Sequence, residues 1–250
     1  MLRPSVGRPG SAFTLIELLV IVAIIGVLIS MLLPALGRTG ENMRRVLCTT
    51  NQREAIKGWA LYASDHDGEY PTFKFRSSFE HIHWLYKLDI ASQRYDYGID
   101  FDWVIACPNR DPVDWRNYAR NEVIRISYFI MVGRETGRLG SLSGTDPNLG
   151  AVWVPWESPR HMGRGGGRLA MLSDIDEYRT GSATRGGNIT SVSHTFNGSA
   201  YGPPNTAMWP QDLGSEGGNV GYEDMSVRFL RVKDRHPRKT MRTGAKTGFW

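Results

Sequence analysis

The sequence predicts an α+β protein in which one long N-terminal helix packs on a small antiparallel sheet with long loops. Three features support this: an apolar run at residues 13–36, an amphipathic continuation at 37–64, and β-branched or aromatic segments further along. The chain has 250 residues, 41% hydrophobic and 22% charged, which fits one folded domain plus an anchor.

The apolar run at 13–36 is long enough to cross a membrane. As a helix, a segment of this length extends roughly 36 Å, against about 30 Å for the hydrocarbon core. Arg3 and Arg8 precede it, and positive flanks tend to stay in the cytoplasm. We therefore expect a single crossing, with everything after Leu36 outside the cytoplasm.

Glu17 is the single carboxylate within this run. A charge on a membrane helix is costly, and such residues are usually functional. One interpretation places Glu17 at the cytoplasmic edge, where it reaches water. The other gives it a positive partner: if the chain were cut before Phe13, the new amine of one subunit could meet Glu17 of its neighbour.

The segment 37–64 continues the helix and is expected to bury one stripe. Apolar or small residues recur at spacings of three and four, and charged residues fill the gaps. Turn-forming residues between 65 and 71 then end the helix. The predicted stripe consists of Met43, Val46, Leu47, Thr50, Ile56, Trp59, Ala60 and Ala63.

The remainder, 65–232, supplies the predicted sheet. Residues 123–133 and 168–175 are rich in β-branched, aromatic and other apolar residues typical of strands, and 218–232 predicts a hairpin with a turn at 223–225. Glycine-rich loops at 135–167 and 180–217 contain Trp153, Trp156 and Trp209, which indicates that parts of them are packed.

The N-terminal sequence FTLIELLVIVAIIG (13–26) resembles the prepilin-type cleavage and methylation segment of type IV pilins and type II secretion pseudopilins. The resemblance implies that a prepilin peptidase removes a leader, 1–12, between Ala12 and Phe13 and methylates the new amine. It also implies that Glu17 guides assembly and that Pro34 bends the helix. Ala12 stands where the family usually has Gly.

The same resemblance implies a pilin-like fold and a structural role without catalysis. The chain would be a single-pass protein of the bacterial inner membrane with an extracytoplasmic domain, in the periplasm or on a filament at the cell surface. Other pilin-like subunits would be its partners in a filament of a type II secretion or type IV pilus-like system.

Downstream, residues 48–71 and the blocks ACPNRDP, ISYFIMVG and GGNVGYEDMSVRF are similar to pilin-like proteins with a C-terminal His-x9-Asp-Gly hairpin. Two positions depart from that pattern. Gly214 stands ten residues before Asp224, where His is expected, and Met225 replaces the Gly. His194, in the preceding loop, is a candidate replacement for the missing His.

Candidate ligands of a metal ion are few. His81 and His83 would share one face of a strand but have no third ligand at a recognisable spacing. Some secretion pseudopilins hold calcium in a C-terminal loop, which makes Asp174, Asp176 and Asp224 weak calcium candidates. We expect neither a resident metal nor another cofactor, and no catalytic motif is present.

Cys48 and Cys107 leave two interpretations open. Outside the cytoplasm, the two thiols can form one disulfide that ties the helix to the loop around Cys107. Alternatively, both remain unpaired and are buried as small apolar side chains.

The last segment, 233–250, is strongly basic, and we expect it to be disordered. From Arg231 to the end there are seven Lys and Arg residues against one Asp. A basic tail of this kind can attract DNA or an acidic polymer.

A second functional class also fits the sequence: an extracytoplasmic binding protein, either anchored by the helix or secreted, that contacts an anionic ligand through its loops or its basic tail. In the secreted form, residues 35–37 serve as an ordinary signal-peptide cleavage site and the chain starts at Arg38. Glu17 favours the filament subunit, because a simple anchor needs no carboxylate.

Overall fold

The computed structural model describes residues 14–73, 84–86, 93, 95–99, 104, 106–110, 123–134, 144–179, 189–196, 198–239 and 246–250. The chain divides into two compact units, Met1–Gly40 and Glu41–Trp250. Ala12, Phe13, His81 and His83 lie outside the described residues.

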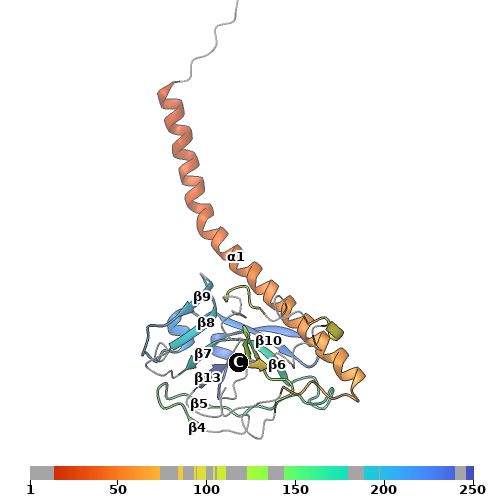
Figure 1. Cartoon of the computed structure of the whole chain (residues 1–250). Coiled ribbons are helices and arrows are strands. Elements are labelled where there is room, and N and C mark those ends of the chain that lie inside the picture. The colour runs from red at the N-terminus through yellow and green to blue at the C-terminus, as the bar shows by residue number, and fades with distance from the viewer. Residues whose placement is uncertain are drawn as a thin grey trace, which may run out of the picture. The chain divides into compact units, whose positions relative to one another are not determined.

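The long N-terminal helix is confirmed. Helix α1 runs over Leu15–Asp65 and contributes to both units (Figure 1). Its apolar N-terminal half is exposed and is long and apolar enough to cross a membrane. We find one such helix within the part of the chain that the structure describes.

The C-terminal half of α1 belongs to the globular unit, and its buried face differs partly from the predicted stripe. Ile56, Trp59, Ala60 and Ala63 are buried as predicted. The predicted stripe is wrong at its N-terminal end, where Met43, Val46 and Leu47 are 62%, 64% and 47% exposed. The face turned inward there carries polar or small side chains instead, namely Glu41, Cys48, Gln52 and Ala55.

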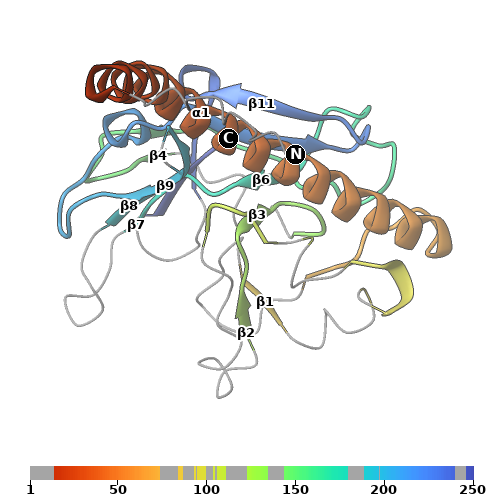
Figure 2. The same ribbon diagram turned by 90° about the horizontal axis from the view of Figure 1, so that it is seen from above.

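The α+β class is confirmed by a four-stranded antiparallel sheet in the order β11-β10-β6-β3. The C-terminal half of α1 crosses over this sheet (Figure 2). The single strand predicted at 123–133 is found as two short strands, β2 and β3, of which only β3 joins this sheet. The strand predicted at 168–175 is found as the shorter β6, and the hairpin at 218–232 is confirmed. The bounds are β2 Val123–Arg125, β3 Tyr128–Ile130, β6 Ala170–Asp174, β10 Gly217–Tyr222 and β11 Val227–Arg231.

A second antiparallel sheet has five strands in the order β12-β13-β7-β8-β9. Two further sheets each pair two short strands, β1 with β2 and β4 with β5. The remaining bounds are β1 Trp84–Tyr86, β4 Gly144–Thr145, β5 Val152–Trp153, β7 Glu177–Arg179, β8 Ile189–Thr195, β9 Gly198–Tyr201, η2 Pro210–Leu213, η3 Val232–Asp234, β12 Pro237–Lys239 and β13 Lys246–Phe249.

The C-terminal segment corrects one prediction. The composition of residues 233–250 predicts disorder, but β12 and β13 pair with each other, and β13 also pairs with β7. Phe249 and Trp250 are buried, and the Trp250 ring lies 5.4 Å from Phe129 and 5.7 Å from Trp156. Apolar burial therefore holds Phe249 and Trp250 in place, whereas residues 240–245 of the predicted tail lie outside the described residues.

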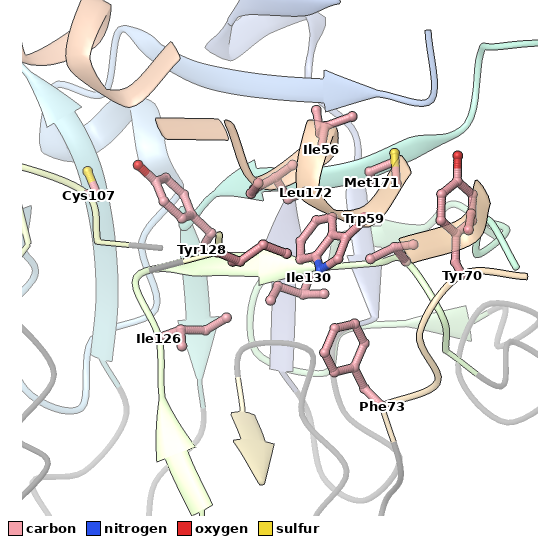
Figure 3. Packing of buried hydrophobic residues seen from close by; sticks show 14 of the residues in the cluster. Ile56, Trp59, Tyr70, Phe73, Cys107, Ile126, Tyr128, Ile130, Met171 and Leu172 are labelled. Carbon is pink, nitrogen blue, oxygen red and sulfur yellow. The ribbon is translucent and has the colours of Figure 1, made fainter. Parts of the chain in front are cut away.

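The main core lies between α1 and the four-stranded sheet (Figure 3). Trp59 is fully buried at its centre, makes an edge-to-face contact with Phe73, and donates from its indole nitrogen to Gln93. At the other end of this core, Figure 3 shows the Tyr128 hydroxyl directed toward the side on which Cys107 lies.

Candidate functional site

The N-terminus of α1 is capped by its own side chains. The Glu17 carboxylate accepts hydrogen bonds from the backbone N–H and the hydroxyl of Thr14, at 2.9 and 2.8 Å. In return, the Thr14 hydroxyl accepts from the Glu17 N–H at 3.2 Å. This reciprocal pair is a capping box, which satisfies donors that a helix start otherwise leaves unpaired.

The capping box gives Glu17 a structural role in addition to the predicted assembly role. The surrounding apolar side chains are exposed, with Leu15 at 79% and Ile16 at 74%. Pro34 falls within α1, which is helical on both sides of it.

The second candidate site is a buried group of Cys48, Cys107, Asp174 and His194, which we call the four-ligand cluster. One potential metal-ligating atom from each residue lies within 4.8 Å of the other three. The four residues come from α1, the loop at 106–110, the end of β6 and β8. None is more than 1% exposed.

Short distances connect neighbouring members of the cluster. The two sulfur atoms are 3.2 Å apart, and both cysteines are free. His194 Nε2 lies 3.9 Å from Cys107 Sγ and 3.1 Å from Asp174 Oδ2. The two cysteines lie side by side, as the disulfide interpretation requires, but both are unbonded and buried, as the alternative interpretation expects. A disulfide has an S–S bond of about 2.05 Å.

The other ring nitrogen of His194 is held by Glu41. Nδ1 lies 2.7 Å from Glu41 Oε1, and the amide of Asn109 donates to both oxygens of the same carboxylate, at 3.1 and 2.9 Å. Arg45 contributes a further hydrogen bond to Glu41 at 3.2 Å. An N–H at Nδ1 therefore faces the carboxylate, and Nε2 is left facing the cluster.

Asp174 and Cys48 are positioned in the same way by neighbouring polar groups. The Gln52 amide donates to Asp174 Oδ1 at 2.9 Å, and the backbone N–H of Asn219 donates to Oδ2 at 2.6 Å. The Tyr128 hydroxyl lies 3.3 Å from Cys48 Sγ. Polar contacts thus orient these two members as well.

The buried charges shift the pKa values of the cluster strongly. Burial alone would lower the pKa of His194, but Asp174, Cys107 and Glu41 together raise it to about 12. Burial alone would raise the pKa of Asp174 and of Glu41, yet His194 holds both below their ordinary values. Without another cation, these contacts favour the imidazolium form of His194, which lies between two carboxylates.

The two thiols shift in opposite directions. A hydrogen bond from Cys48 to its sulfur lowers the pKa of Cys107 to about 6. Burial and the same contact raise the pKa of Cys48 well above its ordinary value. Of the two thiols, Cys107 is therefore the one that ionises more readily. Because it is 1% exposed, a substrate has no direct access to it.

The calcium candidates do not form one site. Asp174 belongs to the four-ligand cluster, whereas Asp176 pairs with Arg235 at 2.6 Å between Oδ2 and Nη1. Asp224 accepts from the backbone N–H of Ser226 in the turn between β10 and β11. That turn places Met225 at φ +63°, in the left-handed region, at the position where the related pattern has Gly.

The four-ligand cluster was missed by sequence reasoning because its members lie at positions 48, 107, 174 and 194. Metal sites that can be recognised from sequence have two ligands within a few residues of each other. Each member carries a separate sequence signal: Cys48 and Cys107 as a possible pair, Asp174 as a calcium candidate and His194 as a replacement for the missing His. Nothing in the sequence joins these signals into one site.

The comparisons with known proteins concern the N-terminal segment. Residues 8–33 match the sequence profile described as the prokaryotic N-terminal methylation motif. No curated protein and no solved structure is significantly similar to the chain. The chain therefore carries a prepilin-type N-terminus on an α+β protein with one candidate membrane helix, which is consistent with a pilin-like precursor.

Proposed function

We propose that this chain is a pilin-like structural subunit, cut before Phe13 by a prepilin peptidase and assembled through α1 into a filament of a type II secretion or type IV pilus-like system. The observation that carries the proposal is the methylation motif at residues 8–33, which overlaps the start of a helix apolar enough to cross a membrane. The unit Glu41–Trp250 would then lie outside the cytoplasm.

The exposed apolar surface of α1 supports assembly through this helix. Its N-terminal half leaves large apolar side chains uncovered, which suits lipid before assembly and helix packing afterwards. Further along the same helix, within the globular unit, Met43, Val46 and Leu47 are exposed as well. Their side chains are free of the domain's own core and can pack against neighbouring subunits.

Glu17 fits both the single chain and the filament. In the single chain it closes the capping box with Thr14. In the filament, the carboxylate would exchange this contact for the methylated amine at Phe13 of a neighbouring subunit. A buried carboxylate that loses its partner is costly in an apolar environment, so this pairing would favour one register between subunits.

The experiment that tests the proposal is mass spectrometry of the intact protein and of its N-terminal peptide, isolated from native membranes. The expected result is a chain that begins at Phe13 and carries one added methyl group. A chain that begins at Arg38 would indicate ordinary secretion, and an uncut Met1 would indicate a static anchor. Either result contradicts the proposal and favours the binding protein.

A further inference from the structure

We propose that the four-ligand cluster is a structural zinc site, in which Cys48, Cys107, Asp174 and His194 bind one Zn²⁺ inside the globular unit. This inference is independent of the proposed function. It concerns the metal content of the folded domain, whether or not the N-terminus is processed and assembled.

The chemistry of the donors selects the kind of metal. Two thiolates, one imidazole and one carboxylate form a mixed sulfur, nitrogen and oxygen set, which suits Zn²⁺. Ca²⁺ and Mg²⁺ are excluded because they require oxygen ligands, six or more in the case of Ca²⁺. Four protein ligands with at most 1% exposure make a closed site, which is typical of structural and not of catalytic zinc.

The spacing of the four ligand atoms is comparable to the size of a zinc coordination shell. Zinc–ligand bonds of 2.0–2.3 Å give edges of about 3.3–3.8 Å between tetrahedral ligands. The observed distances are 3.2 Å between the two sulfur atoms, 3.9 Å from Cys107 Sγ to His194 Nε2, and 3.1 Å from Nε2 to Asp174 Oδ2. All the other distances between the four ligand atoms are at most 4.8 Å, so the four atoms surround one point at which a zinc ion would sit.

The surrounding polar groups resemble those that orient the ligands of a metal. Zinc-binding histidines usually donate from the second ring nitrogen to a carboxylate, and Glu41 lies 2.7 Å from Nδ1 of His194. Ligating carboxylates are themselves hydrogen-bonded, as Asp174 is by Gln52 and Asn219. The ligands are thus positioned by the fold itself.

A proton or a disulfide accounts for less of this arrangement than a metal ion does. One N–H at Nε2 can bond well to Asp174 but does not draw Cys48 and Cys107 toward the same point. A disulfide requires sulfurs about 2.05 Å apart and makes no use of His194. A single cation at the centre satisfies all four groups at once.

Zinc at this position would fasten α1 to both large sheets. Cys48 lies on α1, Asp174 ends β6 of the four-stranded sheet, and His194 lies in β8 of the five-stranded sheet. Cys107 adds the loop at 106–110. The site would thus take the place of apolar packing along a stretch of α1 whose inward face is largely polar.

The first test measures metal content by inductively coupled plasma mass spectrometry on the full chain, purified in detergent without chelators. We expect about one zinc per chain. Cys107→Ser and Asp174→Asn should each lower this at least fivefold. Asp212→Asn, which changes an exposed carboxylate in the same way, should retain the full zinc content.

A second measurement on the wild-type chain does not depend on the folding of variants. After removal of bound metal with a chelator, Co²⁺ is added and the absorption spectrum recorded. A tetrahedral Co²⁺ spectrum with thiolate charge-transfer bands is expected, and it should disappear when Zn²⁺ is added. Alkylation after chelation and denaturation should modify both cysteines.

Three outcomes would overturn the proposal, the first two of which are seen on the wild-type chain. The first is a folded wild-type chain without bound metal that gives no tetrahedral Co²⁺ spectrum. The second is an intact mass two hydrogen atoms lower, with neither cysteine alkylated, which would identify a disulfide. Equal zinc content in wild type, Cys107→Ser and Asp174→Asn would place the metal elsewhere and would equally contradict the assignment.

Discussion

Glu41 Oε1 lies 2.7 Å from Nδ1 of His194. This contact links strand β8 to Glu41, which is the first residue of α1 that belongs to the globular unit. Both side chains are buried, and the contact spans 153 residues of sequence. A buried carboxylate holds the imidazole, and the imidazole lowers the pKa of the carboxylate. This pair therefore makes stability depend on pH.

Glu41→Gln should destabilise the metal-free chain at pH 7 by about 2–3 kcal/mol, because the amide keeps an acceptor but removes the charge that pairs with His194. The pKa of Glu41 is lowered in the folded state relative to its ordinary value of 4.5. Its contribution to the free energy of unfolding is therefore fully present above pH 4.5 and is lost as the pH falls below that value. The variant should thus lose less stability than wild type between pH 5 and pH 3.

Urea unfolding in the presence of a chelator, followed by circular dichroism, measures both effects. Glu216→Gln is the matched control, since Glu216 also pairs with Arg45 but is half exposed. It should change stability by less than about 0.5 kcal/mol. Equal acid sensitivity of wild type and Glu41→Gln would show that the pair is not coupled to folding.

Arg235 and Lys233 lie two residues apart, yet their replacement should have very different effects. Arg235 is buried and donates to Asp176 and to the hydroxyl of Ser173, at 2.6 and 3.1 Å. Arg235→Met leaves Asp176 without its cation and should lower the free energy of unfolding by about 3–5 kcal/mol. Lys233→Met, at an exposed position, should change stability by less than about 0.5 kcal/mol. Thermal unfolding compares the two variants.

The C-terminal residue should also carry substantial stability. Trp250 is 4% exposed and packs against Phe129 and Trp156. Trp250→Ala should therefore lower the free energy of unfolding by about 3–5 kcal/mol, as measured by urea unfolding. Tyr201→Ala removes an aromatic ring that is 57% exposed and should cost less than about 1 kcal/mol. A loss of less than about 1 kcal/mol in the unfolding free energy of Trp250→Ala would contradict this prediction.

The parts of the fold that sequence predicted are those with local signals. An apolar run indicates the N-terminal half of α1, and a β-branched pattern followed by turn residues indicates the hairpin of β10 and β11. The C-terminal prediction is wrong because the charge composition indicates disorder, whereas the burial of Phe249 and Trp250 depends on tertiary packing. The burial of two aromatic side chains stabilises this segment more than its seven dispersed charges destabilise it. One of these charges, on Arg235, is itself buried in an ion pair.

The four-ligand cluster shows why the candidate site was harder to predict. The periodic pattern of α1 predicts an apolar buried stripe, which leaves polar Glu41 and Gln52 outside it. They are buried because each has a partner on a distant strand, His194 for one and Asp174 for the other. Such pairings depend on tertiary structure and leave no periodic pattern in the sequence.

Met225→Gly should stabilise the globular unit by up to about 1 kcal/mol. Met225 adopts φ +63°, which costs a non-glycine residue about 1–2 kcal/mol, partly offset by the greater flexibility of Gly in the unfolded chain. Its side chain is 43% exposed, so little packing is lost. Urea unfolding measures the gain. Met225→Ala, which keeps the strained conformation, is the control and should give no increase.

The two roles of Glu17 can be separated by paired substitutions. Glu17→Gln retains a side chain that can close the capping box with Thr14 but removes the charge. Thr14→Ala removes the hydroxyl contact of the cap and keeps the charge. If the carboxylate acts in assembly, Glu17→Gln should insert into the membrane normally but enter sheared filament fractions at least tenfold less than wild type, while Thr14→Ala assembles at near-normal levels.

The amount of each variant in membrane and filament fractions, measured by immunoblotting, checks this prediction. Ser30→Ala serves as a control within the same helix, because it removes one hydroxyl that bonds to its own helix backbone at Val27. Normal assembly of Glu17→Gln together with failure of Thr14→Ala would show that Glu17 is retained for helix capping. The charge would then have no part in subunit pairing, because an uncharged amide would serve the filament equally well.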